Sequence, residues 1–156
     1  MDIYGYLKKD HRKVANLMEQ VVASPTASER EQLFQQIKME LTLHADTEEK
    51  TFYQAVLDAT RAKSVEEKME HADHEHDEIR EFLDKLSGLS ADSSEWLIHF
   101  GELKHSVEHH VEEEEGEIFE KAKKYLSDTQ AKDLAKAMDA LKKQQMKTMP
   151  QPEPAM

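Results

Sequence analysis

Residues 44–49, His-Ala-Asp-Thr-Glu-Glu, have a counterpart later in the chain at residues 110–115, His-Val-Glu-Glu-Glu-Glu. In each stretch a histidine precedes a glutamate by four residues, a spacing that brings Cβ atoms within about 5 to 6 Å on one face of an α-helix. Large apolar and aromatic residues follow both stretches, at 52–53 and 118–119. Each stretch therefore predicts a long helix that turns a His-Glu pair, together with apolar residues, toward a core.

The duplication extends beyond these two stretches. His11 matches His76 at a shift of 65 positions, and His44 matches His110 at a shift of 66. Apolar residues keep the same register in both halves: Val14 with Ile79, Leu17 with Phe82, Ile37 with Leu103, and Leu41 with Val107. A repeat that preserves both the apolar stripe and the polar interruptions predicts two similar helix pairs, related by a pseudo-two-fold axis.

Six polar residues interrupt these apolar stripes at matching depths. Buried ionisable groups are costly unless they are paired or bind a metal. The pattern therefore predicts that six residues meet at a metal centre: His11, His44, Glu48, His76, His110 and Glu114.

The numbers and types of these donors suit two ions, each held by two imidazoles, with Glu48 and Glu114 as bridges. Zinc would need only four ligands, and calcium or magnesium would favour oxygen. We therefore expect two iron ions joined by an oxo or hydroxo bridge, with manganese as the second choice. Each ion would keep one exchangeable position for a small molecule.

The other histidines are expected outside this centre, and His109 is the only close rival. His109 and Glu113 share the four-residue spacing, but using them would break the register of the two halves. For Glu49 and Glu115 the pattern leaves two interpretations, orientation of a ligand or exposure to solvent. Tyr53 is close enough in sequence to contact either the core or the ligands, and core packing is the favoured role.

Composition indicates an all-α fold, because only four glycines and four prolines occur in 156 residues. We predict an antiparallel up-down four-helix bundle over residues 1–126, an accessory helix over 127–147 and a disordered tail over 148–156. The predicted bundle helices span about residues 3–22, 28–61, 64–86 and 93–126. A capping box is expected at Ser28 and Glu31.

Charge and residue content narrow the classes of function. The net charge of −12 argues against nucleic-acid binding, and the absence of cysteine excludes thiolate metal sites. The first residues show no secretory signal, and no segment has the roughly 20 apolar residues that a membrane span needs. We therefore expect a soluble, cytoplasmic protein that is a monomer or a weak homo-oligomer.

Two His-x-x-x-Glu-Glu motifs that alternate with two lone helix histidines make residues 1–126 resemble the hemerythrin-like family of HHE cation-binding domains, in its small stand-alone prokaryotic form. The resemblance implies a bundle that holds a non-haem di-iron centre. Oxygen-carrying members place a further histidine where this chain has Ala72, and they use a His-x-x-x-x-Asp pattern in the last bundle helix where this chain has His110-x-x-x-Glu114. These differences make simple oxygen carriage a less suitable hypothesis.

The leading hypothesis is a di-iron protein that reacts with hydrogen peroxide or oxygen in oxidative or nitrosative stress. A catalase-like activity would follow from it, but the sequence leaves open whether the protein is an enzyme. The alternatives are a module that reversibly binds or senses O2 or NO, and a protein that stores or donates iron.

Overall fold

The computed structural model describes residues 1–149, and its first half is a helical hairpin. Helix α1 (Ile3–Ala23) is followed by α2 (Ala27–Glu48). The second of these runs without a break through a π-helical segment, η1 (Glu49–Tyr53), into α3 (Gln54–Ala59). The predicted 28–61 helix is therefore present, but with a change of helix type directly after Glu48.

The second half repeats this arrangement. Helix α4 (Lys63–Ser87) is followed by α5 (Ser94–Glu113), which continues through a π-helical segment, η2 (Glu114–Ile118), into α6 (Phe119–Tyr125). A final helix, α7 (Asp128–Met146), begins with a capping box built by Ser127. π-Helical turns are rare and frequently occur at functional sites, so their presence in both halves draws attention to Glu48 and Glu114.

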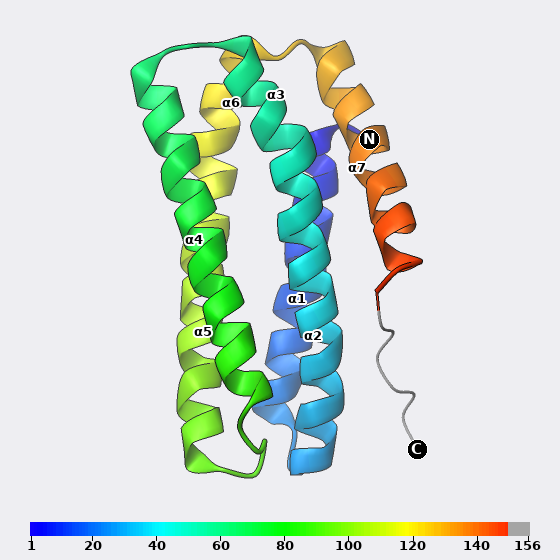
Figure 1. Ribbon diagram of the computed structural model, residues 1–156, viewed down its shortest axis with the longest axis vertical. Helices are drawn as coiled ribbons and strands as arrows, with labels where there is room; N and C mark the ends of the chain where they lie inside the picture. Colours follow the sequence, from blue (N-terminus) through cyan, green and yellow to red (C-terminus); the bar gives the residue numbers. More distant parts are fainter. Residues whose placement is uncertain (150–156) are drawn as a thin grey trace.

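The four long helical rods alternate in direction, as Figure 1 shows, and α7 lies outside the bundle against α1 and α2. No strand occurs within residues 1–149, so the predicted all-α bundle is confirmed. Most of the tail predicted to be disordered, residues 150–156, lies outside the described residues. Within the described part, no helix is both long and apolar enough to cross a membrane.

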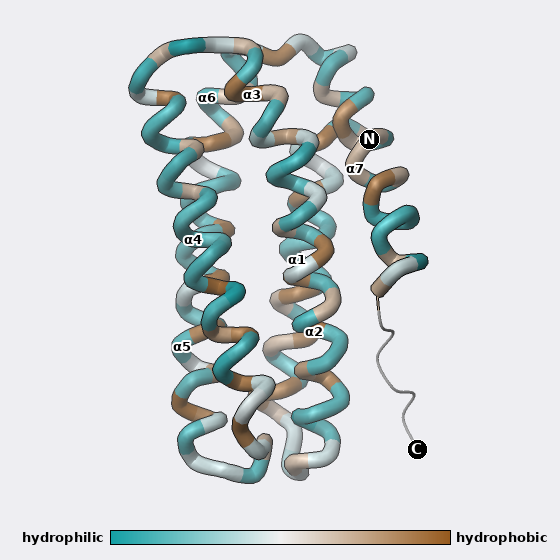
Figure 2. Tube along the Cα trace, viewed as in Figure 1, coloured by the Kyte–Doolittle hydropathy of each residue, from teal (hydrophilic) through white to brown (hydrophobic). Residues whose placement is uncertain are grey.

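Two apolar clusters fill the bundle, one toward each end. The first contains Leu7, Phe52 and Phe119, and the second contains Phe34 and Trp96. Figure 2 shows polar and apolar segments alternating along the helices, which is the pattern expected of helices with one buried face. All six predicted ligands lie along the chain between the residues of the two clusters, so the polar site occupies the middle of the bundle.

Helix ends follow ordinary capping chemistry, with two differences from prediction. The cap of α2 is Thr26, whose hydroxyl accepts a hydrogen bond from the N–H of Glu29 at 3.2 Å, so the expected capping box at Ser28 is wrong. The cap lies two residues earlier because Thr26 is the residue with extended backbone, and the helix begins at Ala27. At the other end, Thr60 is extended, which stops α3 at Ala59.

Candidate metal centre

The six predicted ligands come together at mid-bundle, one histidine each from α1 and α4, and a His-Glu pair from each long rod. All are buried, and both Glu48 and Glu114 have 0% of their surface exposed. Two overlapping groups have donor atoms within 4.8 Å of one another: His11, His44 and Glu114 in one, and Glu48, His76, His110 and Glu114 in the other. Glu114 belongs to both groups, as a bridging ligand would.

The Nε2 atoms of all four histidines face the two carboxylates. Glu114 places Oε1 3.1 Å from Nε2 of His11 and Oε2 3.3 Å from Nε2 of His110. Glu48 places Oε1 3.4 Å from Nε2 of His44 and 3.2 Å from Nε2 of His76. Each glutamate therefore spans one histidine from each half of the duplicated sequence.

Several of these atoms have no hydrogen-bond partner although they are buried. They are Nε2 of His11 and His44, both carboxylate oxygens of Glu48, and Oε1 of Glu114. Buried polar groups are normally satisfied, so unpartnered atoms that converge on one point need an explanation. Two cations would satisfy imidazole nitrogens and carboxylate oxygens together, and the donor set therefore fits a dinuclear metal centre.

Each histidine is oriented by a carboxylate on its other nitrogen. The Nδ1 atoms of His44 and His110 lie 2.9 Å from Asp10 and Glu75, and these two pairs occupy matching positions in the repeat. A hydrogen bond of this kind fixes the tautomer, so that Nε2 is left free to bind a metal.

The other two histidines follow the same rule across the bundle. The Nδ1 of His11 lies 2.7 Å from Glu115, and the Nδ1 of His76 lies 2.6 Å from Glu49. The structure thus favours the first of the two interpretations left open for Glu49 and Glu115, because each of them contacts the histidine that it would orient.

Electrostatics in the ion-free chain follow from this packing. Burial alone would lower the pKa of His44, but the carboxylates of Glu48 and Asp10 raise it to about 10. For His110 burial acts in the same direction, and Glu114 and Glu75 again raise the pKa to about 10. These histidines hold protons that balance the buried carboxylates, and metal ions that bind Nε2 would replace those protons.

Tyr53 reaches the centre, where packing in the apolar core was expected. Its hydroxyl donates a hydrogen bond of 2.5 Å to Oε2 of Glu114, and its oxygen lies 3.3 Å from Nε2 of His110. Burial, reinforced by Glu114 and Glu48, holds the pKa of Tyr53 well above its usual range, so the phenol stays neutral.

The π-helical segment explains why α-helical spacing favours core packing for Tyr53 over a contact with Glu114. In an α-helix a residue five positions after Glu48 is rotated by about 140° from it. A π segment, with its i to i+5 hydrogen bonds, brings residues five apart close to one face. The matching position in the second half is Phe119, which has no hydroxyl.

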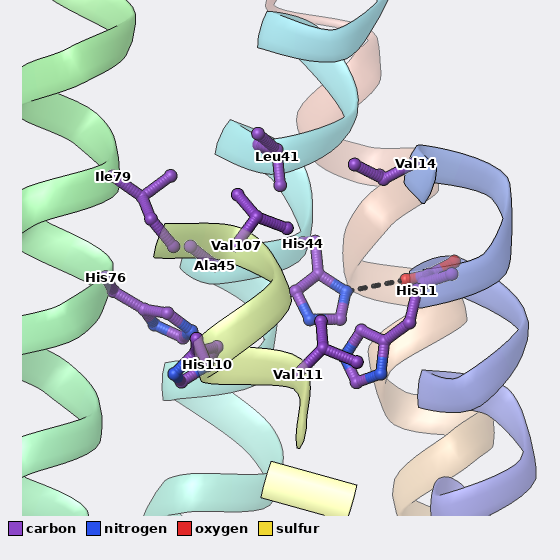
Figure 3. Close-up of a pocket in the computed structure, with 11 residues that line it drawn as sticks. His11, Val14, Leu41, His44, Ala45, His76, Ile79, Val107, His110 and Val111 are labelled. Carbon is purple, nitrogen blue, oxygen red and sulfur yellow. Dashed lines mark hydrogen bonds and ion pairs between the residues drawn. The ribbon is translucent and has the colours of Figure 1, made fainter. Parts of the chain in front are cut away.

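A cavity of about 30 Å³ lies beside the histidines. Figure 3 shows the four imidazoles below a cap of apolar side chains, which includes Val14, Leu41, Ile79 and Val107. One water molecule needs about 10 to 15 Å³ of such space, so this volume has room for about two water-sized atoms. Its wall belongs equally to both halves, because Val14 matches Ile79 and Leu41 matches Val107 in the repeat.

A groove of about 280 Å³ between α1 and α5 leads toward this cavity. We call it the access groove, and it shares His11, Val107 and Val111 with the cavity wall. Ala15 also lines it. At the position of Ala15 in the second half stands Arg80, which pairs with Asp46 at 2.8 Å and with Glu49 at 3.0 Å.

The rival histidine of the sequence pattern, His109, lies at the surface. His109 is 62% exposed as a side chain, whereas His110 is 4% exposed and turned inward. The register of the two halves therefore predicted the histidine that the fold places in the core.

The accessory helix also reaches toward the centre. Lys142 of α7 is buried and pairs with Asp10, the carboxylate on Nδ1 of His44. Asp10 has its pKa lowered to about 2: burial alone would raise it, but His44 and Lys142 lower it. Tyr6 fastens the same helix through a hydrogen bond of 3.1 Å from its hydroxyl to Asp139.

Four histidines and two glutamates in the core of a helical bundle place this chain in the class of metal-binding helical bundles. The family model described as the Hemerythrin HHE cation binding domain matches residues 2–122. The chain therefore belongs to the hemerythrin HHE cation-binding domain family, as the resemblance of its motifs predicts.

Two known proteins are similar in sequence to this chain. A DNA nickase from Nostoc sp. is 28% identical over 142 residues, covering 91% of this chain and 39% of that protein. An uncharacterized hemerythrin-like protein from Schizosaccharomyces pombe is 26% identical over 135 residues, covering 86% of this chain and 66% of the relative. The chain thus spans less than two thirds of the length of either relative.

Among solved structures, a Hemerythrin HHE cation binding domain-containing protein from Mycobacterium kansasii superimposes with a TM-score of 0.82. It is 23% identical, and the match covers 95% of this chain and 89% of that one. At this level of identity the likeness supports the fold.

Proposed function

We propose that this chain binds two iron ions through His11, His44, Glu48, His76, His110 and Glu114, and that the centre reacts with hydrogen peroxide or oxygen. The observation that carries the proposal is the convergence of four Nε2 atoms and two carboxylates, several without any partner, beside a small apolar cavity. Mixed nitrogen and oxygen donors suit iron, with manganese second.

Glu48 and Glu114 would bridge the two ions, because each carboxylate faces a histidine of both halves. Two bridging carboxylates would hold two metal ions together while the charge on those ions changes. Two bound iron ions would supply the electrons that are exchanged with oxygen or peroxide. The protein supplies positions, charge balance and a dry wall.

The surroundings favour a reaction over passive storage. The cavity of about 30 Å³ admits a molecule of two heavy atoms at most, such as O2, NO or hydrogen peroxide. Tyr53 holds a neutral phenol whose hydrogen bond is aimed at the centre, and it can donate a hydrogen bond to an oxygen atom that gains negative charge.

The test is to load purified full-length protein with iron, add hydrogen peroxide and follow oxygen evolution with an electrode. We expect turnover well above that of the same amount of free iron, and loss of that turnover in His76→Ala. A stable, reversible oxygen or nitric oxide adduct without turnover would instead support the binding alternative. Iron that leaves readily to a chelator, with neither response, would support storage or donation.

The remaining expectations stay predictions. They are a cytoplasmic location, a monomer or weak homo-oligomer, and the absence of a nucleic-acid partner, which rests on the net charge of −12. The name DNA nickase belongs to a relative of which this chain covers 39%, and a gel-shift assay with duplex DNA would test whether the acidic chain binds DNA at all.

A further inference from the structure

A second group of potential metal ligands lies on the outer face of α4 and α5, away from the buried centre. We call it the surface cluster, and it consists of His71, Glu75, His109 and Glu113. Two His-x-x-x-Glu pairs face each other here, one on each helix. Donor atoms of His71, Glu75 and Glu113 lie within 4.8 Å of one another.

The histidines of the surface cluster point at the same two oxygens. Nε2 of His71 lies 3.5 Å from Oε2 of Glu75 and 3.7 Å from Oε2 of Glu113. Nε2 of His109 lies 3.6 and 3.5 Å from these same atoms. All four separations are too long for good hydrogen bonds.

These separations are close to those inside a zinc site. Zinc binds nitrogen and oxygen at about 2.0 to 2.2 Å in a tetrahedral arrangement, which places neighbouring ligand atoms about 3.4 Å apart. Small rotations of two half-exposed imidazoles would close the remaining difference, because His71 and His109 are 50% and 62% exposed as side chains.

In each of the two carboxylates of the surface cluster, one oxygen already has a partner outside the cluster. Oε1 of Glu75 contacts Nδ1 of His110 at 2.9 Å, and Oε1 of Glu113 pairs with Lys68. Their Oε2 atoms remain for the cluster, and Oε2 of Glu113 is buried with no hydrogen-bond partner. Two carboxylates held this close repel each other unless a proton or a cation lies between them.

The matching surface of the first half has different residues and is covered by α7. Its four positions are Tyr6, Asp10, Leu43 and Thr47, and α7 covers this side, where Lys142 pairs with Asp10 and lies 4.7 Å from the ring of Tyr6. The surface cluster is therefore not a by-product of the repeat, since it exists only in the half that carries no accessory helix.

We propose that the surface cluster binds one divalent transition metal ion of the zinc class, with His71, Glu75 and Glu113 as ligands and His109 or water completing four-fold coordination. Glu75 is shared between this ion and His110. Occupancy of the surface cluster therefore withdraws negative charge from the carboxylate that orients a ligand of the buried centre.

The test uses the full chain as purified, with its iron measured, and equilibrium dialysis against Zn²⁺. We expect the wild type to gain one Zn²⁺ per chain without losing iron. The double variant His71→Ala/His109→Ala should bind this Zn²⁺ at least about 10-fold more weakly, since it lacks both nitrogen donors. Cobalt(II) should give intense tetrahedral visible bands in the wild type and weak ones in the variant.

His74→Ala is the matched control, because His74 is an exposed histidine of the same helix that pairs with Glu78 at 3.2 Å with the same spacing. It should bind Zn²⁺ as the wild type does. Equal Zn²⁺ affinity in the wild type and the double variant, both with unchanged helical circular dichroism, would overturn the proposal. So would Zn²⁺ uptake that only replaces iron ion for ion. Failure of the buried centre to hold iron would leave this comparison intact.

Discussion

In the first half of the duplicated site, His11 borders the access groove, and α7 closes off Asp10. In the second half, Arg80 occupies the place of that groove, and Glu75 opens onto the surface cluster instead of a covering helix. The inner donors nevertheless match one for one, as do the carboxylates on each Nδ1. The side chains that face the centre are therefore the same in both halves, while their surroundings differ.

This division has a physical reason. Donor atoms must meet a common pair of ions, so a change in one half would break the match to the other. Residues farther out need only keep each carboxylate in place, and Lys142 or Arg80 can do that in different ways. These surroundings can therefore differ, with a groove beside His11 and a phenol beside His76 and His110.

The largest effect is expected for Glu114→Ala, because this carboxylate faces both ion positions. Bound iron should fall from about two ions per chain to less than one, as measured by elemental analysis. Glu112→Ala, an exposed neighbour on the same helix, should keep both ions. Full retention of iron by Glu114→Ala would refute the assignment of bridging ligands.

Tyr53→Phe should act on the reaction and leave the metal content unchanged. Loss of one hydrogen-bond donor to developing negative charge typically costs about 10²- to 10³-fold, so we expect peroxide turnover to fall about 100-fold. Tyr4→Phe is the matched control in the same apolar cluster, because the Tyr4 hydroxyl is buried and makes no hydrogen bond. Equal rates in both variants would show that the asymmetric phenol has no chemical role.

Asp10→Asn and Glu75→Gln test whether the two halves are energetically equivalent. Each change weakens the hydrogen bond that orients one histidine, and such partners typically contribute 10- to 100-fold to metal affinity. We expect about a 10-fold loss in each, measured by competition with a chelator. Lys142→Met should cost less, because Asp10 would keep its contact with His44. A loss in only one half would mean that the two ions are bound unequally.

The sequence alone predicted which six polar side chains meet in the middle of the bundle, because they follow α-helical spacing and recur in both halves. Register selected His110 over His109, and the pattern predicted four bundle helices to within about two residues at most ends. It did not predict the π-helical segments, since no local rule distinguishes Glu49–Tyr53 from an α-helix. The direct contact of the Tyr53 hydroxyl with Glu114 was not predicted for that reason.

The sequence also did not predict contacts between segments that are far apart in the chain. Lys142 is separated from Asp10 by 132 positions, and only the packing of α7 on α1 brings them together. Likewise, the surface cluster joins two helices whose relative rotation the sequence pattern does not specify. The four-residue spacing is visible for His109 and Glu113 and also for His71 and Glu75, but the sequence does not show that the two pairs face each other.

The smallest effect is expected for Ala15→Arg, which gives the first half the arginine of the second. Glu112 and Glu115 occupy the positions that match Asp46 and Glu49, so acceptors for the new guanidinium are already present. The variant should keep its iron and its helical content, since Ala15 is exposed.

An arginine that bridges these carboxylates would cover the access groove, as Arg80 covers its counterpart. Peroxide should then reach the centre several-fold more slowly, while the reaction at saturating peroxide changes little, which stopped-flow measurements over a range of concentrations would separate. Ala15→Ser leaves the groove open and should react as the wild type does. An unchanged second-order rate in Ala15→Arg would mean that small molecules reach the cavity by another path, and that the difference between Ala15 and Arg80 has no bearing on access.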